Sequence, residues 1–296
     1  MDKKGHPILM VLAVLVGVAL VLGVSVALIF KLFLPSTNFS FNNKIGVIPI
    51  EGVISDSLTI TAQLEKFRRD KRIKAIVLRI DSPGGSIGPT QEICREVRKT
   101  AKAKTIVASM GGVAASGGYY IAVAADKIVA NPGTITGSIG VIMHFVRFRE
   151  LLDKIGIHFE VLKSGEFKDI GSPHRELTKN DKKLLNAMIA EIKRQFVEEV
   201  AKDRGLSVER VEKISDGRII LGSEAQKLDL VDSLGNFQDA VELAKKLAGI
   251  KGEVTLVYPR KENFRLWEIF LNSLTKSVIQ QIGDVEEQME YRWSGF

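Results

Sequence analysis

The sequence contains very little cysteine and histidine. One cysteine, Cys94, and four histidines occur among 296 residues. A single cysteine excludes an intrachain disulfide and any metal site built on paired cysteines. Cys94 lies on the apolar side of a predicted helix, so we expect it to be buried. Nothing in the pattern indicates a metal or an organic cofactor, and we predict neither.

Charge of one sign is not concentrated anywhere in the chain. The formal net charge is +7, which would suit an acidic partner such as nucleic acid. However, the basic residues alternate with acidic ones along the predicted helices, as in residues 191–202. This alternation is typical of a solvated helix face, so we predict no nucleic-acid partner.

One long uncharged run lies near the N-terminus. Residues 8–30 form an uncharged stretch of 23 residues. As a helix it would extend about 34 Å, enough to cross a hydrocarbon core of about 30 Å. A cleaved signal peptide is the alternative, with small residues at 25–27, but the run is longer than a usual signal sequence and continues past that point. We expect an uncleaved transmembrane anchor, with residues 1–7 inside and the long following domain translocated outside.

Beyond a polar linker at 31–43, short apolar strands alternate with amphipathic helices. Strands are predicted at 44–50, 74–80, 105–109 and 127–130, with helices at 59–69, 90–102 and 117–125. Further helices are predicted at 178–204, 208–213 and 223–227, and a strand-like run at 157–162. The alternation indicates βαβ units and a mainly parallel sheet. Residues 44–258 are the predicted catalytic domain, and an amphipathic C-terminal extension follows at 259–296.

Three glycine-rich turns follow predicted strands, and each contains a serine. The turns are residues 81–88, 110–120 and 133–140. Glycine allows a backbone N–H to approach a ligand closely, and open α/β sheets bind ligands at the carboxyl ends of their strands. Such turns are also common connectors, so no single serine identifies a site by itself.

The first turn offers one alternative. Residues 84–88 match the G-x-S-x-G nucleophile elbow of α/β-hydrolases, with Ser86 between a strand and a helix. That fold would need a histidine downstream, and His144, His158 and His174 follow. A triad with His174 is possible, although nothing in the pattern singles it out.

Four sequence blocks, in order, resemble the signatures of the short form of signal peptide peptidase A. The blocks are Ile80–Gly85, Ala115–Tyr120, Thr136–Gly140 and Lys163–Ile170. The resemblance runs from about Lys44 to Ala248. It implies an α/β fold with a Clp protease/crotonase-like core, in which a mainly parallel sheet with flanking helices follows one transmembrane helix.

The resemblance also implies a site and an activity. Ser116 would be the nucleophile and Lys168 the general base, with the backbone N–H groups of Gly85 and Gly117 as the oxyanion hole and Ser138 bonded to the lysine. Members of the short form build rings in which the serine of one subunit meets the lysine of its neighbour, so a homo-oligomer is implied. The implied function is a serine endopeptidase that acts through an acyl-enzyme. It would degrade signal peptides and other small or unfolded peptides at the extracytoplasmic face of a bacterial-type cytoplasmic membrane.

The proposed chemistry requires Lys168 to be uncharged when it accepts a proton. An ordinary lysine, with a pKa of about 10.4, is charged at neutral pH, and a dry pocket is needed to remove its proton. Glu166 and Asp169 lie close to it in sequence. Either carboxylate would favour the charged ammonium if it lay near, so both are expected to point away.

Two further functions and one structural question stay open. An acyl-CoA hydratase or hydrolase on the same core would use the oxyanion hole without a nucleophile, and an inactive membrane scaffold would use neither.

Peptide substrates are expected to be extended and to add as a strand beside the turn at 84–85. The amphipathic C-terminal extension could pack on its own domain, on a neighbouring subunit or on the membrane.

Overall fold

The computed structural model describes residues 15–26, 43–259 and 289–292. The chain divides into two compact units, Met1–Phe41 and Asn42–Phe296. In the first unit, residues 15–26 form a helix whose side chains are all exposed. The remainder of the predicted anchor, and most of the C-terminal extension, lie outside the described residues. Within the described part of the chain, no helix combines the length and the apolar character that crossing a membrane requires.

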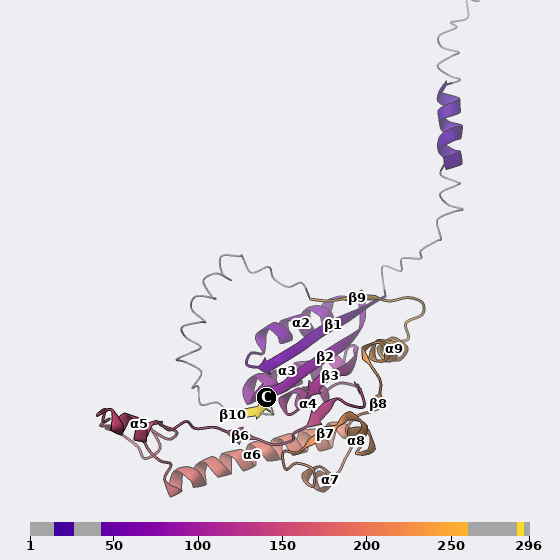
Figure 1. The fold of residues 1–296 in the computed structure, drawn as a ribbon. Coiled ribbons are helices and arrows are strands. Elements are labelled where there is room, and N and C mark those ends of the chain that lie inside the picture. The colour runs from indigo at the N-terminus through magenta and orange to yellow at the C-terminus, as the bar shows by residue number, and fades with distance from the viewer. Residues whose placement is uncertain (1–14, 27–42, 260–288, 293–296) are drawn as a thin grey trace, which may run out of the picture. The chain divides into compact units, whose positions relative to one another are not determined.

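The second unit contains the predicted parallel sheet (Figure 1). Its central strands are β1 (Lys44–Ile54), β2 (Ile73–Ser86), β3 (Thr105–Ala114) and β4 (Lys127–Ala130). They alternate with α2 (Leu58–Arg69), α3 (Ile87–Ala101) and α4 (Gly117–Ala122). The pairs β1–β2, β2–β3 and β3–β4 are all parallel, which confirms the predicted α/β fold.

Alternating side chains of the strands feed two separate cores. Ile76, Leu78 and Ile80 belong to the larger core, which also contains buried residues of α2, α3 and α4. Ala75 and Val77 point to the opposite face and pack in a smaller core with residues of α9 (Phe237–Leu247). Because successive strand residues face opposite sides, a sheet covered on both faces needs nearly continuous apolar strands. This is why the apolar runs predicted the strands well. The predicted burial of Cys94 is also confirmed.

Smaller elements complete the sheet. They are β5 (Ile135–Gly137), β7 (Ile219–Leu221), β8 (Ser233–Leu234) and β9 (Thr255–Val257), with the short helices α7 (Val208–Glu212) and α8 (Gly222–Lys227). β5 pairs with β3 and, in the antiparallel sense, with β7. β5 therefore leads the third glycine-rich turn back to the carboxyl end of β3.

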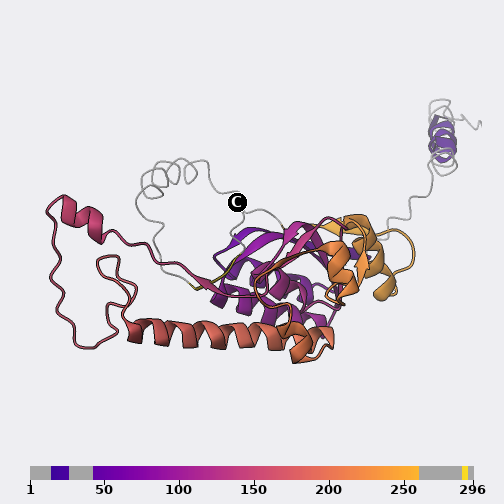
Figure 2. The same ribbon diagram turned by 60° about the horizontal axis from the view of Figure 1, so that its bottom comes forward.

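An arm extends from the sheet between β6 (Ile142–Met143) and α6 (Lys179–Arg204). It contains α5 (Arg149–Lys154), and both views place α5 well away from the sheet (Figures 1 and 2). The buried apolar residues of α6 are mostly in its C-terminal half, which packs on the larger core. The predicted strand at 157–162 is wrong, since these residues are exposed and form no strand. An alternating pattern becomes a strand only where a neighbouring strand supplies hydrogen-bond partners.

The last described element is β10 (Met289–Arg292). It pairs antiparallel with both β2 and β6, although it is more than 140 residues from either along the chain.

Candidate active site

The backbone of Ser116 has an unusual conformation. Ser116 lies between β3 and α4 with φ 52° and ψ −116°. Among the described residues, only Ser116, Ser138 and Asp229 have a positive φ without being glycine. Such conformations are costly and persist where surrounding contacts enforce them, which is often at active sites. Here the Ser116 N–H donates to Gly137 O at 2.8 Å, and the Tyr120 N–H donates to Ser116 O at 2.8 Å.

Gly117 presents a backbone donor directly after this serine. It is the first residue of α4, and the first N–H groups of a helix have no acceptor within the helix. Among the backbone hydrogen bonds found for the described residues, none is donated by the Gly117 N–H. This amide is therefore available for an oxyanion that forms at a group attacked by Ser116.

The turn that carries Ser138 is joined to the Ser116 turn. The Thr136 hydroxyl donates to Ala114 O at 2.7 Å, and Gly137 O accepts from the Ser116 N–H. Ser138 itself has φ 49°, and its N–H donates to Arg218 O at 2.8 Å. Both serines are buried, with exposed fractions of 1% and 7%. The structure thus brings the second and third glycine-rich turns together.

The first turn is held against β1 and the start of α4. The Ser82 hydroxyl donates to Gly52 O at 2.6 Å and accepts from the Gly84 N–H at 3.1 Å. The Ala115 N–H donates to Ser82 O at 3.1 Å, which connects this turn to the residue before Ser116. Three of the four predicted signature blocks therefore meet at the carboxyl ends of β2 and β3.

A close approach at Gly85 makes a specific stability prediction. A Cβ atom at this position would lie 2.1 Å from Ile54 O, so Gly85→Ala must displace backbone. We expect the variant to lose about 2 kcal/mol or more of unfolding free energy, as for other overpacked positions. Denaturant titration of the purified chain measures this loss.

The matched control for that experiment is Gly88→Ala. A Cβ at Gly88 would meet nothing within 4 Å, and Gly88 lies in the first turn of α3. Alanine is favoured over glycine in helices, so this variant should be as stable as the parent chain or more stable. Equal stability of the two variants would contradict the assigned close approach.

Ser86, the alternative nucleophile, has an ordinary backbone. It ends β2 and precedes α3 with φ −60° and ψ 138°. The strained turn expected for a nucleophile elbow is therefore absent at Ser86 and present at Ser116. His144 and His158, two of the three downstream histidines, are exposed residues between β6 and α6, and His174 lies in the same segment, stacked on Phe159.

Lys168 is not assembled with Ser116 within one chain. It lies on the arm between α5 and α6 and is exposed, whereas Ser116 is buried beside the sheet. Within the described part of the chain, the Lys168 ammonium has no hydrogen bond or ion pair. The structure therefore unites four of the five predicted site residues and leaves the lysine apart.

The carboxylates that flank Lys168 are engaged by other residues. Asp169 accepts from Lys163 and from Arg175, both at 2.8 Å. Glu166 accepts from the Asn180 side-chain amide at 2.8 Å. Neither carboxylate is paired with the Lys168 ammonium. The predicted role of Lys168 as a general base requires this absence of pairing, because a nearby carboxylate would favour the charged ammonium.

Arg175 organises this part of the arm, a role that was not predicted from the sequence. Its guanidinium also donates to Asp181 at 2.5 Å, and Asp181 forms a reciprocal capping box with Thr178 at the start of α6. The hydrogen bonds from Arg175 lower the pKa of the Asp169 carboxyl well below its usual range. They also lower the pKa of Asp181 to about 2. The T-x-x-D spacing at 178–181 marks the cap and could have located this cluster.

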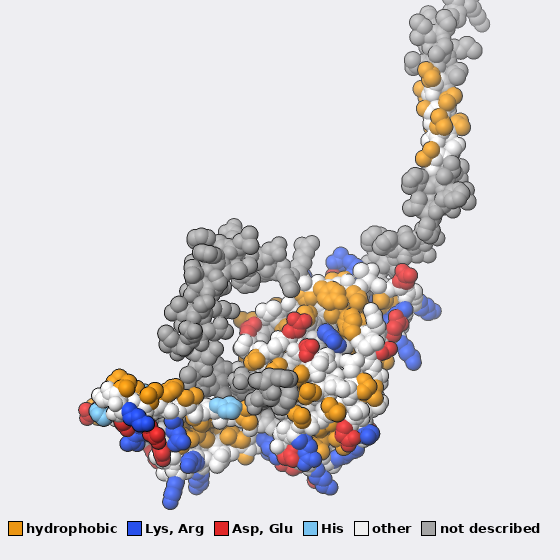
Figure 3. Space-filling model, viewed as in Figure 1, with side chains coloured by type: hydrophobic (Ala, Val, Ile, Leu, Met, Phe, Trp, Pro, Cys, Tyr) orange, Lys and Arg blue, Asp and Glu red, His pale blue; other side chains and the backbone are white. Residues whose placement is uncertain are grey.

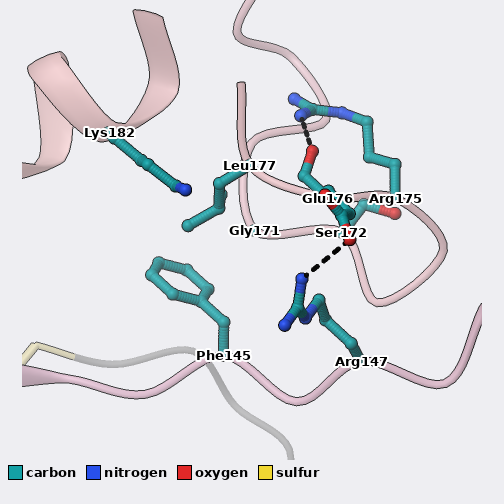
Figure 4. Close-up of a pocket in the computed structure, with 8 residues that line it drawn as sticks. All are labelled: Phe145, Arg147, Gly171, Ser172, Arg175, Glu176, Leu177 and Lys182. Carbon is teal, nitrogen blue, oxygen red and sulfur yellow. Dashed lines mark hydrogen bonds and ion pairs between the residues drawn. The ribbon is translucent and has the colours of Figure 1, made fainter. Parts of the chain in front are cut away.

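A pocket of about 260 Å³ lies next to this cluster rather than at Ser116 (Figure 4). Its lining residues are Phe145, Arg147, Gly171, Ser172, Arg175, Glu176, Leu177 and Lys182. Arg147 reaches Glu176 across it at 3.4 Å. Its basic lining residues are Arg147 and Arg175 of the arm and Lys182 of α6, and no residue of the three glycine-rich turns lines it.

Comparison with known proteins identifies related sequences. Residues 98–251 match the family described as Peptidase family S49, and residues 39–134 match Clp protease. A candidate protease of Synechocystis sp. is 43% identical over 71% of this chain and 76% of its own. A candidate signal peptide peptidase SppA of Enterococcus faecium is 36% identical over 69% of this chain and 64% of its own. A chloroplastic serine protease SPPA of Arabidopsis thaliana is 34% identical over 78% of this chain and 34% of its own.

Proposed function

The chain belongs to peptidase family S49 and is a serine peptidase of the signal peptide peptidase A type, and from this membership we propose that Ser116 and Lys168 form its catalytic dyad. The observation that carries the proposal is the enforced positive φ of Ser116 directly before an available Gly117 N–H. A nucleophile and an oxyanion donor on consecutive residues can act on the same carbonyl group.

The proposed reaction proceeds through an acyl-enzyme. The Ser116 hydroxyl oxygen attacks the carbonyl carbon of the scissile peptide bond while the uncharged Lys168 amine accepts the hydroxyl proton. The Gly117 N–H, with that of Gly85, stabilises the resulting oxyanion. Lysine then passes the proton to the departing amine, and water activated by the same lysine hydrolyses the ester.

We propose that the lysine comes from a neighbouring subunit. The arm that carries Lys168 also exposes a group of large apolar side chains, and Figure 3 displays apolar side chains along it. Those at least 39% exposed include Leu151, Ile155, Ile157, Phe159, Val161, Leu162 and Phe167. A contiguous exposed apolar surface of this kind is typical of a protein contact. A second copy that covered the arm would also desolvate Lys168, which favours its uncharged form.

The proposed substrates are signal peptides released in the membrane, together with other small or unfolded peptides. Residues 8–30 are the proposed anchor, with the peptidase unit on the extracytoplasmic side. The relative from Enterococcus faecium carries the name of a signal peptide peptidase, which supports this choice. An anchored peptidase would meet such substrates where they are released.

A fluorophosphonate probe tests the identity of the nucleophile. We expect one covalent adduct on the tryptic or chymotryptic peptide that contains Ser116, located by tandem mass spectrometry. Ser116→Ala should remove the adduct, and Ser86→Ala should retain it. An adduct on Ser86 would support the α/β-hydrolase alternative and overturn the proposed dyad.

A further inference from the structure

The last part of β3 departs from regular pairing with β2 just before Ser116. Between two successive pairs of this ladder, β2 advances from Ile80 to Ser82 while β3 advances from Met110 to Ala114. β3 therefore contains a bulge, in which two additional residues are inserted. Bulges next to active sites re-aim the side chains near them, and the chain that follows this bulge is the Ser116 turn. The groups that hold the bulge therefore also set the position of the Ser116 hydroxyl.

Side chains hold the first part of the bulge. The Val113 N–H donates to the Asp81 carboxylate at 3.0 Å. The Thr134 hydroxyl donates to Gly111 O at 2.8 Å. A Cβ atom at Gly111 would lie 2.7 Å from the Asp81 carboxylate, so the bulge packs directly against this side chain. These contacts fix the start of the bulge, and its connection to Ser116 is held by other groups.

Each of the three residues 114–116 is held by a different partner. The Ala115 and Ser116 N–H groups donate to backbone carbonyls of the first and third glycine-rich turns. Ala114 is held by a side chain, because its carbonyl accepts from the Thr136 hydroxyl at 2.7 Å. Ala114 and Thr136 are both fully buried. Of these three contacts, the one from Thr136 alone uses a side chain, so a substitution can remove it without altering the backbone.

The strand that carries Thr136 is itself firmly held. β5 pairs with β3 at Ile135 and with β7 along all of its residues. The residue after Thr136, Gly137, is the one whose carbonyl accepts from the Ser116 N–H. Residues 136 and 137 thus hold the chain on both sides of Ala115, one through a hydroxyl and the other through a carbonyl. A site supported from a paired strand keeps its geometry better than one supported from a loop.

We propose that Thr136 is a positioning residue for the nucleophile, because its bond to Ala114 O sets the place of the Ser116 hydroxyl relative to the Gly117 N–H. The proposal rests on the proposed function of Ser116. Thr136 acts through the backbone of residues 114–116 and has no role as acid, base or nucleophile in it. A displacement of about 1 Å in a reacting group can cost about 10²-fold in rate. Loss of this one hydrogen bond should therefore slow the chemical step and leave substrate binding intact.

Two substitutions at this position test the role of the hydroxyl. Thr136→Val replaces the hydroxyl with a methyl group and keeps the shape of the side chain. We expect kcat for peptide hydrolysis to fall about 10- to 100-fold at unchanged KM, because the loss is confined to the transition state. Thr136→Ser keeps the hydroxyl and should retain most of kcat. Equal kcat values for the two variants would overturn the positioning role.

Thr134→Val is the matched control for general destabilisation. Thr134 is 1% exposed, and its hydroxyl also donates to a carbonyl of the β3 bulge. This hydroxyl additionally accepts from the Asn131 N–H at 3.1 Å, so its loss should lower the denaturation midpoint at least as much as Thr136→Val does. We expect Thr134→Val to keep kcat close to the parent value, since its contact lies further from Ser116 along the chain. An equal loss of kcat in both valine variants would show a structural role only and overturn the proposal.

A second comparison applies if Thr136→Val does not fold. Thr136→Ser and Thr136→Ala both lose the methyl group, and only alanine also loses the hydroxyl. We expect kcat of the alanine variant to be about 10-fold or more below that of the serine variant, at the same KM. Equal kcat values for this pair would contradict positioning through the hydroxyl.

The rate of fluorophosphonate labelling separates this proposal from the proposed function. Attack on the probe requires the nucleophile and its oxyanion donor but no bound peptide. We expect Thr136→Val to slow labelling by the same factor as kcat, with the adduct still on Ser116. Labelling at the parent rate would overturn the positioning role and leave the nucleophile in place. An adduct on another residue of the parent chain would overturn the proposed nucleophile, and the role of Thr136 with it.

Discussion

Replacing Ser116 with alanine is expected to reduce peptide hydrolysis on the order of 10⁶-fold, the loss typical of removing a serine nucleophile. The loss should fall on kcat, because the hydroxyl contributes to bond formation and little to substrate binding. Steady-state hydrolysis of a fluorogenic peptide by the purified 296-residue chain measures it.

Two controls make this result specific to the nucleophile. The folded state should survive, since the hydrogen bonds that hold residue 116 use its backbone N–H and carbonyl, and alanine retains both. A positive φ is about as unfavourable for alanine as for serine, so the circular dichroism spectrum and the thermal unfolding temperature should change little. Ser86→Ala should retain activity because Ser86 is not the attacking group. Full activity of Ser116→Ala would remove the basis of the proposed mechanism.

The central sheet could be predicted from the sequence because its strands are buried on both faces. A strand such as 74–80 is apolar almost throughout, and this signal is local to the strand. Its true extent, to Ser86, was not apparent, since the last residues include Pro83, Gly84 and Gly85. These residues extend the strand only because β1 and β10 supply partners on its two edges.

Features that depend on contacts between distant parts of the chain could not be predicted from local sequence patterns. The positive φ of Ser116 is enforced by Gly137, in a different turn, and no local pattern encodes that contact. The run at 157–162 has the alternation of a strand but no partner, so its prediction was wrong. The pairing of β10 with β2 joins residues about 200 positions apart, which periodicity cannot detect. Resemblance to a family supplied the site residues, and the structure supplied their arrangement.

The separation of Lys168 from Ser116 leads to a prediction about mixed assemblies. Lys168→Ala alone is expected to abolish hydrolysis, because no base then accepts the Ser116 proton. If each dyad joins the serine of one subunit to the lysine of the next, two inactive variants can complement each other. A Lys168→Ala subunit supplies an intact serine, and an adjacent Ser116→Ala subunit supplies an intact lysine.

The expected recovery follows from counting interfaces in a ring. With equal, random mixing, the serine side is intact with probability one half and the lysine side with probability one half, so about a quarter of the interfaces carry a complete dyad in a head-to-tail ring. Coexpression of the two variants with different affinity tags, followed by purification through both tags, isolates mixed assemblies. Their hydrolysis rate per subunit should be about a quarter of the parent rate, since each complete interface acts alone.

The double variant, with both Ser116→Ala and Lys168→Ala, provides the matched control. Coexpressed with either single variant, it leaves every possible interface without a serine or without a lysine, so these mixtures should be inactive. Complete inactivity of the mixture of the two single variants would instead place both groups of the dyad in one chain. The arm would then have to fold back on its own sheet, because within one subunit the structure holds Lys168 exposed on the arm and Ser116 buried beside the sheet. The complementation experiment therefore distinguishes a dyad completed by assembly from one completed by movement of the arm.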